Sequence, residues 1–159
     1  MTQINNIFIS HVHMDHVGYL LKLMNQTSYA GVYMTEITKV LSEYQLYDRL
    51  FIGKSSDENT RPAARSLFER IATVSFMQTM DFGKYKVTFY PAGHIPGAMM
   101  MLFEAGKKRI LYTGDYSLNN TALTQGCMIP KDVEIDTDIY RPLHYGYGGK
   151  DGKTLSTRS

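Results

Sequence analysis

The order of apolar and polar residues predicts alternating strands and helices in the first half of the chain. Residues 4–10 (INNIFIS) form a short apolar run that predicts a buried strand, and residues 31–35 (GVYMT) predict another. Residues 18–26 have helical spacing, with an apolar side made of Leu20, Leu21, Leu23 and Met24. A longer helix is predicted for residues 36–50. Its apolar face consists of Ile37, Val40, Leu41, Tyr44 and Tyr47.

A third helix is predicted after the polar loop GKSSDENT at residues 53–60. Pro62 suits the first turn of this helix, because proline needs no backbone N–H partner there. The inward side is expected to hold Ala64, Leu67, Phe68 and Ile71, and the outward side Arg61 and Arg65. A basic helix face can grip phosphates, but a solvated surface is the interpretation we favour for these two arginines.

From Phe76 onward the period of the pattern changes to two, which is typical of half-buried strands. In KYKVTFYPA, at residues 84–92, Tyr85, Val87 and Phe89 alternate with Lys84, Lys86 and Thr88. Residues 98–114 (AMMMLFEAGKKRILYTG) predict a hairpin with its turn at 105–107 and its second strand at 109–113. A last strand is expected at 133–139. Strands and helices in mixed order favour an α/β layered fold.

Composition narrows the class of protein without naming a function. The chain has 159 residues, which suits one domain or part of a larger one, and 43% of them are hydrophobic. The net charge of +2 is too small to indicate nucleic-acid binding by itself. Cys127 is the only cysteine, so no internal disulfide can form and a reducing compartment is expected. Because no apolar run of membrane-spanning length and no leader is evident, we expect a soluble cytoplasmic protein without membrane partners.

Four residues with metal-ligand chemistry stand within six positions of the stretch ISHVHMDHVGYL, at residues 9–20. They are His11, His13, Asp15 and His16. Neutral imidazoles and carboxylates are the usual ligands of zinc and of comparable divalent ions. Alternation in an extended loop puts His11 and His13 on the same side, where they could hold one ion, and the other two could reach a second. The opening stretch is therefore interpreted as a metal site.

Two later sites have the same character. In YPAGHIPGA, residues 90–98, His94 follows a predicted strand and lies on a tight loop. In ILYTGDYS, residues 110–117, Asp115 follows Gly114 at the end of another strand, where a carboxylate can bridge two metal ions. Taken alone, His94 could be structural and Asp115 a turn or cap residue. Beside the first motif, the metal interpretation is favoured for both.

These three motifs together resemble those of the metallo-β-lactamase superfamily. The segment PAGHIPGAMMMLFEAGKKRILYTGDYS resembles its β-CASP branch in particular, which includes the RNase J ribonucleases and the mRNA 3′-end processing endonucleases. RNase Z shares the first motif but fits the later segment less well. The resemblance extends from Ile4 to about Gly146. It implies a partial αββα sandwich, namely the first-half core without the cap domain.

The resemblance also implies a role for each candidate residue. His11, His13 and His94 would hold one ion, Asp15 and His16 the second, and Asp115 would bridge both. Zn²⁺ is the favoured ion, with Mn²⁺ or Fe as alternatives. In such families a hydroxide between the ions attacks phosphorus while the ions neutralise charge on the phosphate oxygens. Asp15 and Asp115 are thus the expected catalytic residues, with Asp15 able to orient the hydroxide.

Several family features are absent from the sequence, so an interior piece of a β-CASP nuclease is expected. They are the leading strands with an early aspartate motif, the last metal-binding histidine, the cap domain and a Glu-Ser-Thr-Tyr-Gly-like stretch, which is RPLHYG here. We expect a partial domain over residues 1–146 and a flexible glycine-rich tail over 147–159. His144, in the altered stretch, could be a substitute ligand, although a loop histidine without a metal role is favoured.

Two functions remain open from the sequence. The favoured one is a metal-dependent phosphodiester hydrolase of the RNA nuclease type, acting on nucleic acid, with single-stranded RNA the expected substrate. The alternative is an inactive remnant that works as a binding or scaffold domain. Tyr90, Tyr116, Tyr145 and Tyr147 could stack on bases, although packing is the simpler interpretation for Tyr90. Self-association, or a second chain that supplies the missing elements, is also expected.

Overall fold

The computed structural model describes residues 4–52, 60–131 and 133–142. The chain divides into two compact units. The first contains Met1–Ser75 and Pro96–Ala98, and the second contains Phe76–Ile95 and Met99–Ser159. One unit has a parallel sheet with helices and the other a mostly antiparallel sheet, so the expected α/β class is confirmed.

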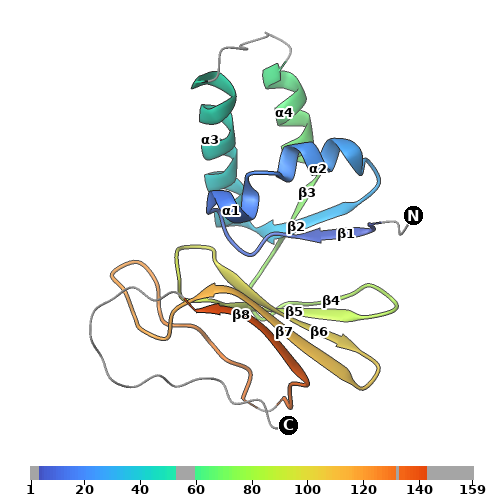
Figure 1. Cartoon of the computed structure of the whole chain (residues 1–159), viewed down its shortest axis with the longest axis vertical. Helices are drawn as coiled ribbons and strands as arrows, with labels where there is room; N and C mark the ends of the chain where they lie inside the picture. The colour runs from blue at the N-terminus through green and yellow to red at the C-terminus, as the bar shows by residue number, and fades with distance from the viewer. Residues whose placement is uncertain (1–3, 53–59, 132, 143–159) are drawn as a thin grey trace. The chain divides into compact units, whose positions relative to one another are not determined.

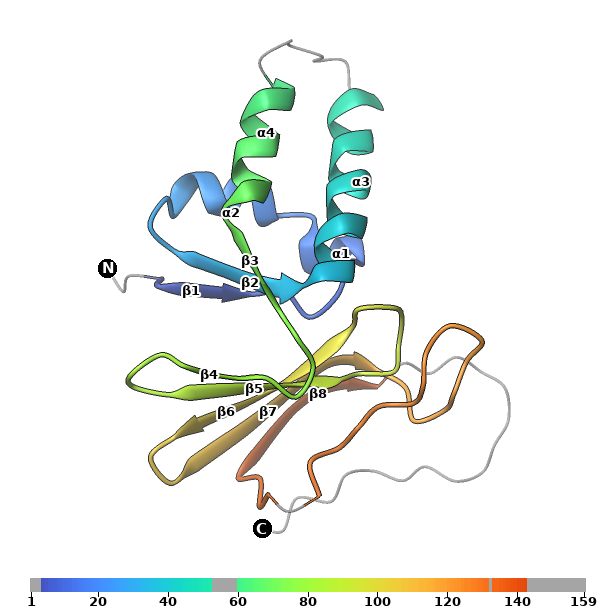
Figure 2. The ribbon, with the colours of Figure 1, turned by 180° about the vertical axis from the view of Figure 1, so that it is seen from behind.

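The first unit is a three-stranded parallel sheet with its helices gathered on one side (Figures 1 and 2). The strands, in spatial order, are β1 (Asn6–Phe8), β2 (Gly31–Thr35) and β3 (Ile71–Val74). The helices are α1 (Met14–Val17), α2 (Leu20–Gln26), α3 (Glu36–Ile52) and α4 (Thr60–Glu69). Parallel neighbours need a crossover connection, and the helices provide it after β1 and after β2.

Most elements predicted for this unit are confirmed, with shifts in their ends. The strand GVYMT has the predicted bounds, and its Val32 and Met34 are almost fully buried. The first predicted strand is shorter than expected and covers only Asn6–Phe8. The first predicted helix is α2, which begins two residues later than predicted. Ile71 was wrongly assigned to the third helix, since it begins β3 and pairs with Val32 there. Apolar residues fit a helix face and a buried strand equally well over so short a run.

The apolar face predicted for α3 is not its buried face. Ile37, Val40, Leu41 and Tyr44 are exposed, by 39% to 72%, and nothing is described for the side chain of Tyr47. The buried face of the helix instead carries Thr38, Ser42 and Leu46. Two of these are small polar residues, so the hydrophobic periodicity indicated the opposite side of the helix as the buried one. This side is buried because of a polar contact, since the Thr38 hydroxyl bonds to Thr35 and to the backbone carbonyl of Gly97.

Two leucines on α3 test this orientation. Leu46 is 5% exposed and Leu41 is 39% exposed. Leu46→Ala is expected to lower the free energy of unfolding by about 2–4 kcal/mol, because it leaves a cavity in the core. Leu41→Ala is expected to lower it by less than about 1 kcal/mol. Urea denaturation of both variants measures the difference, and equal losses would contradict the orientation.

The segment Pro96–Ala98 is anchored to the start of α3 by two buried hydroxyl groups. Thr35 and Thr38 each donate through Oγ1 to the carbonyl oxygen of Gly97, over 2.7 Å and 3.1 Å. Gly97 has φ of +83°, and a Cβ there would lie 2.9 Å from both the Thr35 hydroxyl oxygen and the Thr38 backbone nitrogen. A glycine is therefore required for both its conformation and its lack of a side chain.

A matched pair of glycine variants tests this anchor. Gly97→Ala should lower the free energy of unfolding by about 3 kcal/mol, since it combines an unfavourable φ with a steric overlap. Gly83→Ala is the control. Gly83 has φ of +78°, and a Cβ added there would have no atom within 4 Å beyond its own residue and its two chain neighbours, so only the conformational part, about 1–2 kcal/mol, should be lost. If thermal denaturation shows equal losses, the close approach at Gly97 is not a constraint.

The second unit is a five-stranded sheet in the order β4-β5-β6-β7-β8. The strands are β4 (Thr79–Asp81), β5 (Lys86–Pro91), β6 (Met99–Ala105), β7 (Lys108–Tyr116) and β8 (Thr137–Pro142). Neighbours are antiparallel, except that β7 and β8 are parallel. The predicted hairpin is confirmed as β6 and β7. The strand predicted for 133–139 begins later, as β8, and β4 was not predicted.

The alternation predicted for the KYKVTFYPA strand is confirmed only in part. Val87 and Phe89 are fully buried on β5, as expected. Thr88, expected on the polar side, is also buried, at 9% exposure, and bonds to Thr79 of β4 over 2.8 Å between their hydroxyl oxygens.

In the third predicted helix, which is α4, Phe68 is buried and Arg65 exposed, as expected. His144 and the tail at 147–159 lie outside the described residues.

Candidate metal centre

The histidine-rich stretch starts where the first strand of the parallel sheet ends. Beyond β1, the Ile9 backbone N–H donates to the Tyr33 carbonyl over 3.0 Å, so the chain still follows β2 at that point. Ser10 and His11 are then almost fully buried. Open α/β sheets commonly bind ligands at the carboxyl ends of their strands. The stretch therefore occupies the edge where a site is expected.

The short helix α1 turns the motif back on itself. The His13 carbonyl accepts hydrogen bonds from the backbone N–H groups of His16 and Val17, both over 2.9 Å. The imidazole rings of His11 and His16 are consequently 4.1 Å apart between centroids. The rings of His11 and His13 are 4.9 Å apart and nearly perpendicular. The ring of His11 thus lies next to the rings of both His13 and His16. The sequence pattern predicted the first of these neighbours but not the second.

Ser10 orients two of these rings. Its hydroxyl oxygen lies 3.0 Å from Nδ1 of His11 and 3.3 Å from Nδ1 of His16. A histidine that binds a metal ion is commonly held through its other ring nitrogen, which here leaves Nε2 of each ring as the ligand atom. Ser10 was not predicted from the sequence. The sequence offered only its position directly before His11, and a serine before a histidine does not by itself indicate that it orients the ring.

Asp15 lies beside this cluster. One of its carboxylate oxygens is 3.7 Å from Nε2 of His16, and the Asp15 side chain is about half exposed. Clustered imidazoles with an adjacent carboxylate have the donor chemistry that zinc and similar ions require. The residues of the first motif therefore fit a metal site, and the structure brings all four of them together within the first unit.

The second unit brings His94 and Asp115 together. Strands β5 and β7 are both antiparallel to β6, so they run in the same direction and end at the same edge of the sheet. His94 follows β5, and Asp115 stands near the end of β7. Nε2 of His94 is 3.9 Å from a carboxylate oxygen of Asp115, and the two side chains are 9% and 4% exposed. An imidazole and a carboxylate buried side by side also fit a metal ion.

An irregularity in β7 precedes Asp115. The register with β8 shifts between Tyr112 and Gly114, and Gly114 has φ of +55°. A bulge of this kind interrupts the alternation of side chains and can redirect the residues that follow it. A left-handed residue at this point is favourable for glycine because it has no Cβ. The Thr-Gly-Asp sequence thus has a local structural role as well as a chemical one.

Other candidate groups have less support. Burial raises the pKa of the Cys127 thiol, which reduces its thiolate fraction and disfavours a role as a nucleophile. Tyr90 and Tyr116 are partly buried, and Tyr145 and Tyr147 lie outside the described residues. No helix within the described ranges is both long and apolar enough to cross a membrane.

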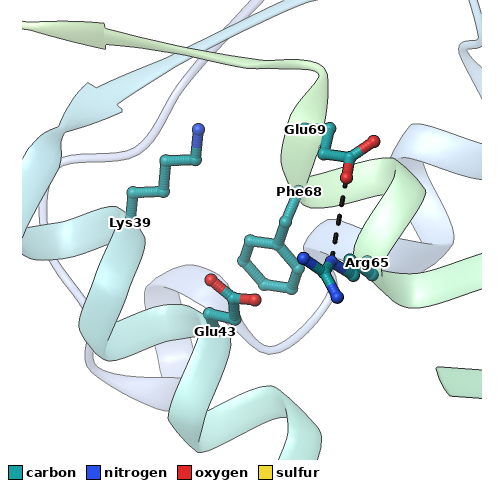
Figure 3. A pocket seen from close by; sticks show the side chains of 5 residues that line it. All are labelled: Lys39, Glu43, Arg65, Phe68 and Glu69. Atoms are coloured by element: carbon teal, nitrogen blue, oxygen red, sulfur yellow. Dashed lines mark ion pairs between the residues drawn. The ribbon is translucent and has the colours of Figure 1, made fainter. Parts of the chain in front are cut away.

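A pocket of about 230 Å³ lies between α3 and α4 (Figure 3). Its lining consists of Lys39, Glu43, Arg65, Phe68 and Glu69. Arg65 pairs with Glu69 over 3.8 Å, and the Lys39 ammonium donates to the Ile71 carbonyl over 3.0 Å. Both cations thus have partners of their own and two carboxylates near them. This favours the solvated-surface interpretation of Arg65 over a phosphate grip.

Comparisons with known proteins match most of the chain. The protein-family model described as "Anti-Pycsar protein Apyc1" matches residues 1–147. The endoribonuclease YSH1 of Eremothecium gossypii is 38% identical over 128 residues, which are 74% of this chain and 17% of that protein. The cleavage and polyadenylation specificity factor 73 of Drosophila melanogaster is 36% identical over 145 residues, which are 87% of this chain and 21% of that protein.

A solved structure supports the fold. It is a protein of unknown function from Enterococcus faecalis V583, with a TM-score of 0.52 and 24% sequence identity. The match covers 73% of this chain and 26% of that one.

The family model and the two curated relatives show that the chain belongs to the Apyc1 family and, with its endoribonuclease relatives, to the β-CASP branch of the metallo-β-lactamase superfamily. It spans about a fifth of the length of those curated relatives.

Proposed function

We propose that the chain carries the metal-binding core of a metal-dependent phosphodiesterase that cleaves RNA. The observation that carries this proposal is the pair of donor groups, three clustered imidazoles in one unit and a buried His94–Asp115 pair in the other. The relatives named as endoribonucleases support RNA as the substrate. Within this proposal, the described residues form the first-half core of an αββα sandwich.

The candidate ligands of both units are proposed to bind two divalent ions, as the resemblance of their motifs to the superfamily implies. His11, His13 and His94 would bind the first, Asp15 and His16 the second, and Asp115 would bridge them. Zn²⁺ suits this mixture of imidazole and carboxylate, with Mn²⁺ or Fe as alternatives. When bound, the ions would supply a water of lowered pKa and would neutralise charge on the phosphate.

The remaining chemistry belongs to residues of the chain. The Asp15 carboxylate, being half exposed, would accept a hydrogen bond from the attacking water and orient it toward phosphorus. Ser10 would keep the rings of His11 and His16 turned so that Nε2 faces the ions. Burial of His11 and Asp115 would keep the ligands ordered and strengthen their attraction for cations.

A substrate panel tests the proposed activity. Single-stranded RNA, the matching DNA and the small diester bis(p-nitrophenyl) phosphate are incubated with the chain, with and without a chelator. Cleavage of RNA that the chelator stops is the expected result. Preference for RNA over DNA would indicate contact with the 2′-hydroxyl. Metal binding without cleavage of any of the three would instead support the scaffold interpretation.

Localisation and assembly remain predictions. The cytoplasmic location expected from the sequence stays untested. Self-association, or assembly with a second chain, also stays a prediction. Sedimentation velocity at several protein concentrations, with and without zinc, measures it. A larger species at higher concentration is expected, and a monomer under every condition would contradict it.

A further inference from the structure

The loop that follows Asp115 is bonded to the residues directly before His94. We call this loop, residues 117–128, the strap, and it is drawn in orange after β7 in Figure 2. Three consecutive carbonyls accept hydrogen bonds from it. The carbonyl of Pro91 accepts from the Met128 N–H over 3.0 Å, that of Ala92 from the Ser117 N–H over 2.9 Å, and that of Gly93 from the Thr124 hydroxyl over 3.1 Å.

Backbone packs directly on backbone where the strap meets this segment. A Cβ at Gly93 would lie 2.4 Å from the Cys127 backbone nitrogen and 2.5 Å from the Ser117 carbonyl oxygen. A Cβ at Gly126 would lie 2.3 Å from the Leu118 carbonyl oxygen. Gly93 also has φ of +71°. No larger residue fits either position without moving main-chain atoms, so the strap and the His94 loop have one closely defined arrangement.

The strap is braced internally as well. The Thr121 and Thr124 hydroxyl oxygens are 2.9 Å apart, and the Thr124 backbone N–H donates to the Thr121 hydroxyl over 3.0 Å. The side-chain carbonyl of Asn120 accepts from the Gly126 N–H over 2.8 Å, and the Cys127 N–H donates to the Ser117 carbonyl over 2.7 Å. These bonds hold the Thr124 side chain where it can reach the Gly93 carbonyl.

We propose that the strap fixes His94 relative to Asp115, and that Thr124 is a positioning residue for metal binding by this pair. The inference rests on the proposed function. The strap begins two residues after Asp115 and is bonded to the residue before His94, so it connects the two ligands by a second path besides the sheet. Groups that orient metal ligands affect affinity because an ion requires its donors within narrow distances. Of the three bonds to residues 91–93, only that of Thr124 uses a side chain.

Four forms of the intact chain test the inference. Thr124→Val keeps the size of the side chain and removes the hydroxyl, whereas Thr124→Ser keeps the hydroxyl. Thr79→Val is the matched control, because it removes a threonine hydroxyl that bonds to Thr88 in the same sheet. Competition with a chromogenic chelator measures zinc affinity for each variant and the parent. Thr124→Val should weaken binding by about 10-fold, while Thr124→Ser and Thr79→Val should stay within about twofold of the parent.

Hydrogen exchange without metal provides a second readout. The peptide that contains His94 should exchange faster in Thr124→Val than in the parent, and Thr79→Val should leave it unchanged. If Thr124→Val binds zinc like the parent, or if both valine variants weaken binding equally, the inference is wrong and the proposed function stands. A parent that binds no zinc overturns both. Should Thr124→Val fail to fold by circular dichroism, Thr124→Ala carries the same expectation.

Discussion

Asp115→Asn is expected to lower hydrolysis by at least about 10²-fold while the chain stays folded. The side chain of Asp115 is 4% exposed and lies 3.9 Å from His94. In the proposed site it bridges two cations, and a neutral amide attracts cations much less than a carboxylate does. The substitution changes no volume, so the core should tolerate it. Turnover of single-stranded RNA and a far-ultraviolet circular dichroism spectrum measure the two effects.

Asp81→Asn is the matched control for that experiment. Asp81 accepts a hydrogen bond from the Gly83 N–H in the turn after β4 and pairs with Lys86 over 3.6 Å. It has no proposed role in metal binding, so hydrolysis by this variant should equal that of the parent. Parental turnover in folded Asp115→Asn would remove Asp115 from the mechanism.

The double variant His11→Ala/His13→Ala is expected to lose about one of the two bound zinc ions. Each change removes a proposed ligand of the same ion, and an ion left with too few protein ligands is released during buffer exchange. His144→Ala is the control, since His144 is favoured as a loop residue without a metal role. Its zinc content should match that of the parent. A double variant that retains parental zinc would show that the assignment of the first motif is wrong.

The local chemistry of the site was readable from the sequence because each motif stands at a strand end. The three histidines of the first motif are close in sequence, so no long-range packing was needed to expect them together. His94 and Asp115 are 21 positions apart, and the sequence predicted each of them at the end of a strand. That they meet at one sheet edge follows from the strand order, in which β5 and β7 are both antiparallel to β6. What the sequence could not supply was the turn of α1, which moves His16 next to His11.

The errors in the fold have a common physical cause. Hydrophobic periodicity identifies the most apolar side of a helix, but the side that is buried depends on the contacts that neighbouring elements make with it. In α3 the buried side carries Thr38, whose hydroxyl reaches the Gly97 carbonyl 59 positions away. Such a polar contact leaves no periodic signal. Short strands such as β4 are missed for a related reason, since three residues show no usable alternation.

The contacts of the strap also could not be predicted from the sequence. Residues 117–128 contain mostly polar and small residues, a composition typical of an ordinary loop. Their role depends on main-chain hydrogen bonds to residues 91–93 and on close approach at Gly93 and Gly126. Glycines in loops have many possible explanations, and only the distances in the folded chain select one of them.

Metal content of the purified chain is the decisive measurement for the proposed site. The proposal is that the histidine motif and the His94–Asp115 pair both bind divalent ions. After extensive dialysis against zinc-containing and then metal-free buffer, inductively coupled plasma mass spectrometry gives the number of ions per chain. The account predicts about two zinc ions per chain in the parent, and at most about one in the double variant of His11 and His13. A parent chain that retains no metal under these conditions would contradict it.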